Sequence, residues 1–172
     1  MAFRTEKVID ANIYVNGRST HGLASEVTCP KINAIMADYN ALGMIGTAQF
    51  ANGFEAMEAT INWKSPDDDT RRDLANPFKT LELQVRSNKR VLDGSGIVED
   101  IPVTIFMRGK CTSYDGGHFV PKEDTEYETT FAIDRYREMI DGQEVVLLDV
   151  LTNTFRVDGE DIFADYRRNL GI

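Results

Sequence analysis

The dipeptide Asp141-Gly142, placed between two extended segments, is the feature that most constrains the fold of this chain. Both central residues of a tight type I′ turn need a positive φ, and Asp-Gly meets that need between strands. Before the turn, apolar and polar side chains alternate over residues 127–134, and after it residues 145–150 form an apolar run. We therefore predict a long β-hairpin over residues 124–149.

The first arm of this hairpin has an unusual expected length. About 15 residues at roughly 3.3 Å per residue give a strand near 50 Å long. A typical strand has only about 5–6 residues. Such a strand extends beyond a single small sheet, so we expect part of it to pair with something outside its own sheet.

The rest of the chain shows the same alternating pattern in shorter segments. Asn16-Gly17 is predicted to join the first two into an N-terminal hairpin. Residues 87–96 are predicted to form a polar loop, in which Gly94-Ser95-Gly96 is a simple turn. With the central hairpin, the total is about eight or nine strands. The further predicted strands are residues 8–15, 22–29, 31–39, 54–64, 78–86 and 101–114.

Two short helices complete the prediction. Ser65 as N-cap, followed by Pro66, begins one helix, which Asn76-Pro77 ends. Asp158 is expected to cap a C-terminal helix that Gly171 closes. The apolar stripe of this second helix consists of Ile162, Phe163, Tyr166 and Leu170. Many strands with two helices predict a mainly β fold, an antiparallel β sandwich or barrel in one domain with helices at its edges.

Composition limits the possible partners and the compartment. The 172 residues carry 28 acidic and 19 basic side chains, for a net charge of −9, so the chain is expected to repel nucleic acid. Cys29 and Cys111 lie in predicted strands and are expected to be reduced core thiols. No apolar stretch approaches the roughly 18 residues that span a membrane, and the N-terminus has no apolar signal core. We expect a soluble intracellular protein without membrane insertion.

The residues that could carry catalysis do not form a catalytic pattern. His21 and His118 have neither metal-ligand spacing nor a cysteine partner. Glu126 and Glu128 would lie about 7 Å apart on one strand face, but exposed strands commonly carry glutamates. The aspartates of residues 67–69 are explained by a helix start. We therefore predict no enzyme, no metal site and no cofactor.

The segment Asn40–Gly46 combines loop glycines with the apolar residues Leu42, Met44 and Ile45. Loops normally lie at the surface, so an apolar loop tip indicates docking onto a partner. The alternative is that the tip folds back over its own core.

A family resemblance is carried by short segments that occur in collinear order over nearly the whole chain. They are VTCPK at residues 27–31, YNALGMIG at 39–46, MRG at 107–109, DTE at 124–126, YREMIDGQEVVLLD at 136–149 and RRNLGI at 167–172. Together they resemble the major tail tube proteins of contractile-tailed phages. The chain departs from the family pattern over residues 65–88, where the family's helix is more apolar.

The resemblance implies a structural subunit of hexameric rings that stack into a hollow tube inside a sheath. The implied partners are further copies of the chain, the tail sheath protein, a baseplate initiator and the tape-measure protein, and DNA passes through the bore without specific binding. The implied location is the virion tail, assembled in the host cytoplasm. Six copies can join an overlong strand and open sheet edges into a closed barrel. Within such a tube, the candidates for ring-to-ring docking are Asn40, Leu42, Met44 and Ile45.

Acidity then suggests a property of the bore. Carboxylates on its wall repel DNA phosphates at short range despite salt. The candidates are Glu126, Glu128 and Asp134 on one face of the long strand; the alternative is that this face points to the sheath or to solvent. Two other functions stay open: a tube subunit of a headless bacteriocin or type VI-like injection device, and a monomeric β-barrel binding protein.

Overall fold

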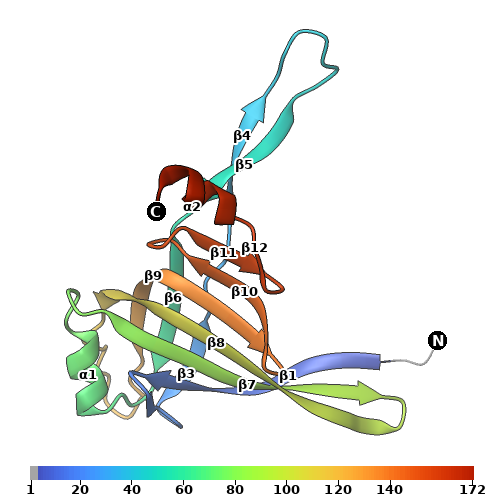
Figure 1. Cartoon of the computed structure of the whole chain (residues 1–172). Helices are drawn as coiled ribbons and strands as arrows, with labels where there is room; N and C mark the ends of the chain where they lie inside the picture. The colour runs from blue at the N-terminus through green and yellow to red at the C-terminus, as the bar shows by residue number, and fades with distance from the viewer. Residues whose placement is uncertain (1–3) are drawn as a thin grey trace.

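The computed structural model describes residues 4–172 and consists mainly of one branched antiparallel sheet (Figure 1). The mainly β, antiparallel class with two short helices is confirmed. The described part of the chain has twelve strands, more than expected, because several are very short or lie in segments predicted to be loops. The elements are β1 (Arg4–Val15), β2 (Arg18–Ser19), β3 (Ala24–Thr28), β4 (Ala34–Tyr39), β5 (Ala48–Phe54), β6 (Met57–Trp63), α1 (Asp68–Leu74), β7 (Leu81–Asp93), β8 (Gly96–Tyr114), β9 (Tyr127–Ile140), β10 (Gln143–Asp149), β11 (Thr154–Val157), β12 (Glu160–Asp161) and α2 (Ala164–Leu170).

Strand β9 is the axis of the sheet, and the predicted hairpin that contains it is confirmed. Asp141 and Gly142 connect β9 to β10 with φ values of 50° and 74°, as a turn with two positive φ values requires. One edge of β9 pairs with β8. The other edge pairs with β6 over its first half and with β10 over its second half. The sheet therefore forks at β9.

The expectation that part of the long strand β9 would pair outside its own sheet is wrong. Both edges of β9 have partners within the chain because β6 and β10 share one of them. The unpaired length lies instead on β8, which pairs with β9 only from Val103 onward. Residues 96–102 of β8 pair with β7 alone. Together with residues 88–93 of β7 and 4–10 of β1, they form a three-stranded projection that we call the overhang (Figure 1).

The overhang also corrects the predicted polar loop at residues 87–96. Strand β7 continues to Asp93 and β8 begins at Gly96, so only Gly94 and Ser95 connect them, and the predicted turn is confirmed at that point. Ion pairs between neighbouring strands stabilise this polar segment in an extended form: Lys89 Nζ lies 2.9 Å from Glu6. Arg90 donates two hydrogen bonds, of 2.8 and 3.1 Å, to the Asp100 carboxylate.

The predicted N-terminal hairpin is only partly correct. β1 pairs with β2 over two residue pairs, whereas β3 pairs with β6. The Leu23 carbonyl fixes this departure, because it accepts hydrogen bonds from the backbone N–H groups of Lys64 and Ser65 just after β6. As a result β1 and β3 diverge, and a slot opens between them.

Two predicted helix caps are wrong. The N-cap of α1 is Asp67, not Ser65; its Oδ1 accepts a hydrogen bond from the Thr70 N–H at 2.9 Å. Asp158 (φ 50°) and Gly159 (φ 80°) form the tight turn between β11 and β12. Helix α2 begins only after Phe163. The predicted end of α2 is confirmed, since Gly171 takes the left-handed conformation there.

The core lies between the β1–β7–β8–β9 layer and the branch of β6 and β3, with α1 covering one end. Trp63 is fully buried, and its indole N–H donates to Thr129 Oγ1 at 2.9 Å. The alternation predicted for residues 54–64 is confirmed over β6, where every second side chain is buried. The largest fully buried apolar side chains are Val15, Ile61, Trp63, Leu74, Leu81, Leu83, Val91, Met107 and Phe131.

Candidate assembly surfaces

The hairpin of β4 and β5 is the most prominent projection of the molecule (Figure 1). It forms a two-stranded sheet of its own, and all six residues of β4 are exposed. We call residues 34–54 the arm. Asp38 is the only charged residue between Lys31 and Glu55. An isolated hairpin is marginally stable in water, and an exposed apolar one is an association site.

The pairing register gives the arm two different faces. Ala37 lies opposite Phe50 and Tyr39 lies opposite Ala48, so these side chains share one wholly apolar face. The rings of Tyr39 and Phe50 meet edge to face with their centroids 6.1 Å apart. The other face carries Asp38, whose carboxylate accepts a 2.7 Å hydrogen bond from Gln49. The arm is therefore amphipathic, but no part of the described chain covers its apolar face.

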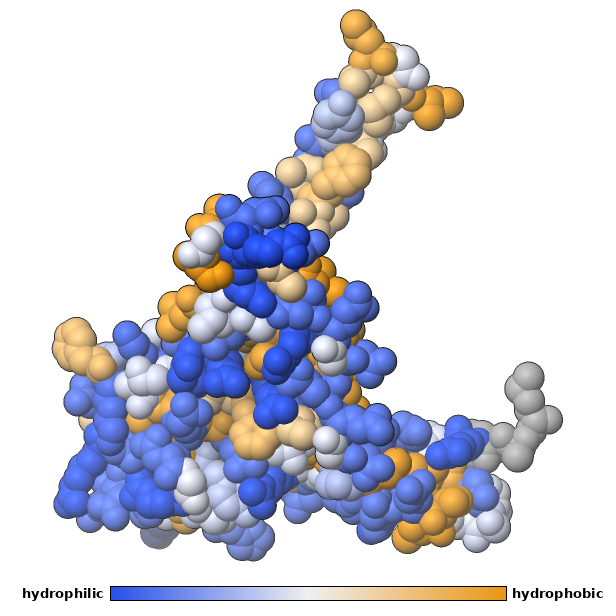
Figure 2. All heavy atoms as spheres, viewed as in Figure 1, coloured by the Kyte–Doolittle hydropathy of each residue, from blue (hydrophilic) through white to orange (hydrophobic). Residues whose placement is uncertain are grey.

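The tip of the arm contains the four predicted docking residues, and all of them are exposed. Leu42 and Ile45 are as exposed as in an extended peptide, at 105% and 111%. The apolar side chains are visible at the far end of the arm in Figure 2. The segment does not fold back over the core of its own chain, so the alternative given for it is wrong. Docking of the tip onto a partner stays a prediction.

The predicted bore residues do not form one group. Glu126 and Glu128 are exposed at the beginning of β9. Asp134 is half-buried farther along the strand, where β9 changes partner from β6 to β10. Its Oδ1 accepts a 2.9 Å hydrogen bond from Arg108 Nε. The carboxylate of Asp134 is thus neutralised locally, whereas the two glutamates face solvent.

Asp134 belongs to a group of charged side chains that the sequence analysis missed, and we call it the arginine cluster. It consists of Arg108, Arg135, Arg137, Arg156, Asp134, Glu144 and Asp149. Glu144 is held between Arg137 at 2.6 Å and Arg156 at 2.9 Å. Asp149 is held between Arg108 at 3.5 Å and Arg135 at 3.7 Å. Only the register of β8, β9, β10 and β11 brings these residues together, and no short motif signals it.

The arginine cluster makes a testable link between pH and stability. Burial acts to raise the pKa of Glu144, but the hydrogen bonds and charges of Arg156 and Arg137 outweigh it and place the pKa below its ordinary value of 4.5. A lowered folded-state pKa stabilises the fold above the unfolded-state value, and this contribution is lost as pH falls through the folded-state value. Glu144→Gln should therefore lower the free energy of unfolding by about 1–2 kcal/mol at pH 7.

Urea titrations of the wild type and Glu144→Gln, at intervals from pH 7 to pH 3, measure this effect. The difference in the free energy of unfolding between wild type and variant should have its full value above pH 4.5 and should become smaller below it. Glu58→Gln, which alters an exposed glutamate on β6, is the matched control and should have little effect. A difference at Glu144 that stays constant down to pH 3 would contradict the assignment.

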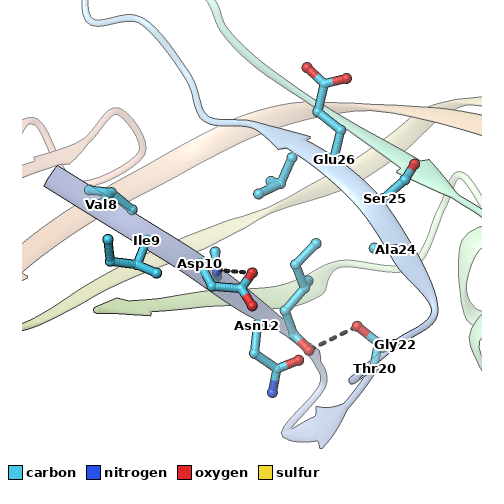
Figure 3. A pocket seen from close by; sticks show the side chains of 12 residues that line it. Val8, Ile9, Asp10, Asn12, Thr20, Gly22, Ala24, Ser25 and Glu26 are labelled. Atoms are coloured by element: carbon cyan, nitrogen blue, oxygen red, sulfur yellow. Dashed lines mark hydrogen bonds between the residues drawn. The ribbon is translucent and has the colours of Figure 1, made fainter. Parts of the chain in front are cut away.

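The slot between β1 and β3 has a volume of about 290 Å³. Figure 3 shows Val8 and Ile9 on its β1 side and Ala24 and Glu26 on its β3 side. At one end, Thr20 Oγ1 donates a 2.8 Å hydrogen bond to the Ile13 carbonyl and ties the chain after β2 back to β1. Next to the slot, residues 4–12 of β1 have no strand partner among the described residues on the edge that faces away from β7.

A second hollow, of about 400 Å³, lies where the base of the arm meets α2. Phe54 of the arm packs against Phe155 with ring centroids 4.8 Å apart, and Phe163 packs against both rings. This aromatic contact anchors the base of the arm to the body. The rest of the predicted stripe of α2, namely Ile162, Tyr166 and Leu170, is about half exposed.

Cys29 and Cys111 are free thiols, and burial raises the pKa of each. Within residues 4–172, no group of three or more histidine, cysteine or acidic side chains is arranged to hold a metal ion. In the same range, no helix has the length and apolar character needed to cross a bilayer.

The family described as "Phage tail tube protein FII" matches residues 5–171. The tail tube protein of Escherichia phage P2 is 28% identical over 164 residues, which cover 94% of each chain.

Two solved structures share the fold. One is a chain from the sheath–tube complex of an extracellular contractile injection system, PVC, in the extended state, with a TM-score of 0.56 and 14% identity over 75% of this chain and 87% of that chain. The other is a chain from the PVC sheath/tube terminator in the extended state, with a TM-score of 0.55 and 12% identity over 75% of this chain and 92% of that chain.

Proposed function

The chain belongs to the phage tail tube protein FII family, and from this premise we propose that it builds the hollow inner tube of a contractile tail. Copies associate side by side into hexameric rings, and the rings stack into a tube through which DNA leaves the particle. The role is structural and needs no catalytic group or cofactor. The single observation that carries the proposal beyond the family is the arm, an exposed apolar hairpin that needs a partner surface to cover it.

The arm suits the contact between successive rings. It projects away from the body and ends in the docking residues Asn40, Leu42, Met44 and Ile45, of which the last three are apolar. Full burial of a leucine or isoleucine side chain stabilises a contact by about 1.5–3 kcal/mol before ordering costs are subtracted. The aromatic contact of Phe54 with Phe155 fixes the base of the arm, which limits the ordering cost.

Further partners follow from this role. The outside of the tube contacts the tail sheath protein, a baseplate initiator begins the stacking, and the tape-measure protein occupies the bore before DNA. The subunits are assembled in the host cytoplasm and remain in the virion tail. Chains from a sheath–tube complex and from a sheath/tube terminator share this fold, and they support the sheath as a partner.

Negative-stain electron microscopy of the purified protein over a concentration series tests the proposal. Rings or hollow tubes of uniform bore are the expected result. The mass in solution, measured in parallel, should rise with concentration because association follows mass action. Monomers at every concentration, even with tail initiation proteins added, would contradict a tube subunit and favour a binding protein.

Carboxylates on one face of the long strand β9 are proposed to line the bore and to repel the phosphates of DNA. Glu126, Glu128 and Asp134 remain the candidates, but Asp134 balances Arg108, so its replacement would disturb the fold as well as the bore charge. Glu126→Lys with Glu128→Lys should slow DNA ejection and leave the tubes intact, because lysines attract phosphates. The ejection rate of phage carrying the variant, measured at two salt concentrations, checks the effect.

The matched control for this test is Asp165→Lys on the exposed surface of α2, where the same kind of charge reversal should not affect ejection. Adding Asp134→Lys completes the set of three and should increase the effect if that residue also faces the bore. An unchanged ejection rate in the Glu126 and Glu128 variant would exclude these two residues from the bore.

A second candidate function has one observation in its favour. The fold is shared with chains of an extracellular contractile injection system. The same subunit would then line a headless injection device through which no genome passes. Particles isolated from the producing bacterium distinguish the two: DNA-filled heads on the tails support the phage tube, and tails without heads support the injection device.

A further inference from the structure

We propose that neighbouring copies within a ring join through the overhang: the open β8 edge, residues 96–102, of one copy pairs with the open β1 edge, residues 4–10, of the next. This inference rests on the proposed ring assembly and names the strands that make its lateral contact. The occupant of each open edge is therefore a second copy of this chain.

Both edges are open for a structural reason. The β9–β10 turn stops against the overhang, where the Asp141 N–H donates a 2.9 Å hydrogen bond to the Pro102 carbonyl, so β9 cannot cover residues 96–102. Among the described strands, β7 is the only one that pairs with residues 96–102 of β8 or with residues 4–10 of β1. Unpaired strand edges of this kind favour pairing with another chain.

The two edges also expose apolar side chains that a contact would cover. Val8 and Ile9 on β1, and Ile97 and Val98 on β8, are each about half exposed or more. Figure 2 shows apolar surface over the end of the overhang, where β7 turns into β8. These side chains lie far from the core in the fold, so burial within the chain does not account for them.

Charge favours pairing of unlike edges. The β8 edge carries Glu99 and Asp100 and has no basic residue, whereas on the β1 edge Arg4 and Lys7 balance Glu6 and Asp10. Two β8 edges together would bring acids against acids, which destabilises a strand pair. A β8 edge beside a β1 edge avoids this repulsion, because the β1 edge has no net charge and offers two bases to the acids. Within one copy, Lys7 and Asp100 both lie opposite Arg90 and so stand at the same level of the sheet.

Strand direction gives the pairing a definite geometry. β1 and β8 are both antiparallel to β7, so they run parallel to each other. Rotation about a ring axis keeps these directions, and the contact between copies is therefore a parallel strand pair. Like edges related by a twofold axis would instead run antiparallel, and such a pair would not continue around a ring.

The slot beside β1 provides space for the incoming strand. The open edge of β1 continues from the overhang along the slot, with Val8 and Ile9 at this junction (Figure 3). At the end of the overhang nearest the body, the incoming β8 carries Ile101 and Pro102, and within one copy these residues stand level with Val8 and Asp10. The slot is lined by Val8 and Asp10 of β1. It leaves room for the β8 side chains of the incoming copy that follow Pro102, and for the β9–β10 turn beside them.

Disulfide cross-linking of assembled protein tests the pairing. Neighbouring strands lie about 4.8 Å apart, which is within the Cα separation that a disulfide spans. Lys7→Cys is combined in turn with Ile97→Cys, Asp100→Cys and Pro102→Cys, which all lie on the same face of the sheet as Lys7, so that registers shifted toward either end of the β8 edge are covered. After mild oxidation, at least one of these double variants should give a ladder of covalent multimers up to the size of a ring.

The single variants are the controls, and they also account for the native thiols Cys29 and Cys111. Each single variant should remain monomeric on a denaturing gel. Covalent dimers from Lys7→Cys alone or Asp100→Cys alone would show that like edges meet and would overturn the inference. Tubes that form normally but give no cross-link in any double variant would overturn it as well, while leaving the tube function standing. A wild-type chain that forms neither rings nor tubes would defeat the proposed function itself.

Discussion

Leu42→Ser together with Ile45→Ser is expected to leave the folded subunit intact and to abolish stacking of rings into tubes. Both side chains are fully exposed at the tip of the arm, so the fold of the single chain does not depend on them. In the proposed ring-to-ring contact, each contributes about 1.5–3 kcal/mol when buried. Loss of both should weaken every contact by a factor of about 100 or more.

Electron microscopy and sedimentation together measure the outcome. Isolated rings, or single subunits, should replace long tubes, while the thermal unfolding midpoint stays within the error of the wild type. Ala41→Ser with Thr47→Ser alters the same turn without removing a large apolar side chain and should still give tubes. Tubes of normal length from the Leu42 and Ile45 variant would show that the tip is not the docking element.

Gly109→Ala is expected to destabilise the fold more than any other single-methyl change considered for this chain. A Cβ atom at residue 109 would lie 2.1 Å from the carbonyl oxygen of Ala132 and 2.9 Å from Cδ1 of Ile133. The carbonyl belongs to β9 and cannot withdraw without opening the pairing of β8 and β9. Gly109 also sits at a register shift between these strands, where the backbones approach closely.

The expected loss in the free energy of unfolding is at least about 3 kcal/mol. Urea unfolding followed by tryptophan fluorescence measures it, because Trp63 is fully buried in the core. Gly116→Ala is the matched control: no atom lies within 4 Å of its added methyl group, so the change should stay within about 0.5 kcal/mol. A loss below about 1 kcal/mol at Gly109 would mean that the two strands separate easily at this point.

The sequence determined the elements whose geometry depends on their own residues. Asp141-Gly142 and Asn16-Gly17 both form turns with positive φ, because that backbone requirement is local and few residue pairs satisfy it. The alternation in β6 gave the buried face correctly, since a strand's period of two is read directly from the residues. The apolar character of the arm tip was visible in the sequence, but its exposure was only one of two alternatives that the residues left open.

The tertiary structure alone decided which strands pair and where polar strands exist. Residues 87–93 form a strand because they pair with β1 and β8 on both sides, and this pairing brings Lys89 to Glu6, which lies 83 positions earlier in the chain. β3 pairs with β6 rather than β1, and β9 divides one edge between two partners. The arginine cluster depends on the same choices, since Glu144 meets Arg137 and Arg156 only in the final register.

The physical reason for this division is the range of the forces involved. A turn's φ values and a strand's alternation are set within a few residues, so the sequence shows them. The partner of an edge depends on which distant faces can be buried together and which charges then meet, and those contacts exist only after the chain has folded.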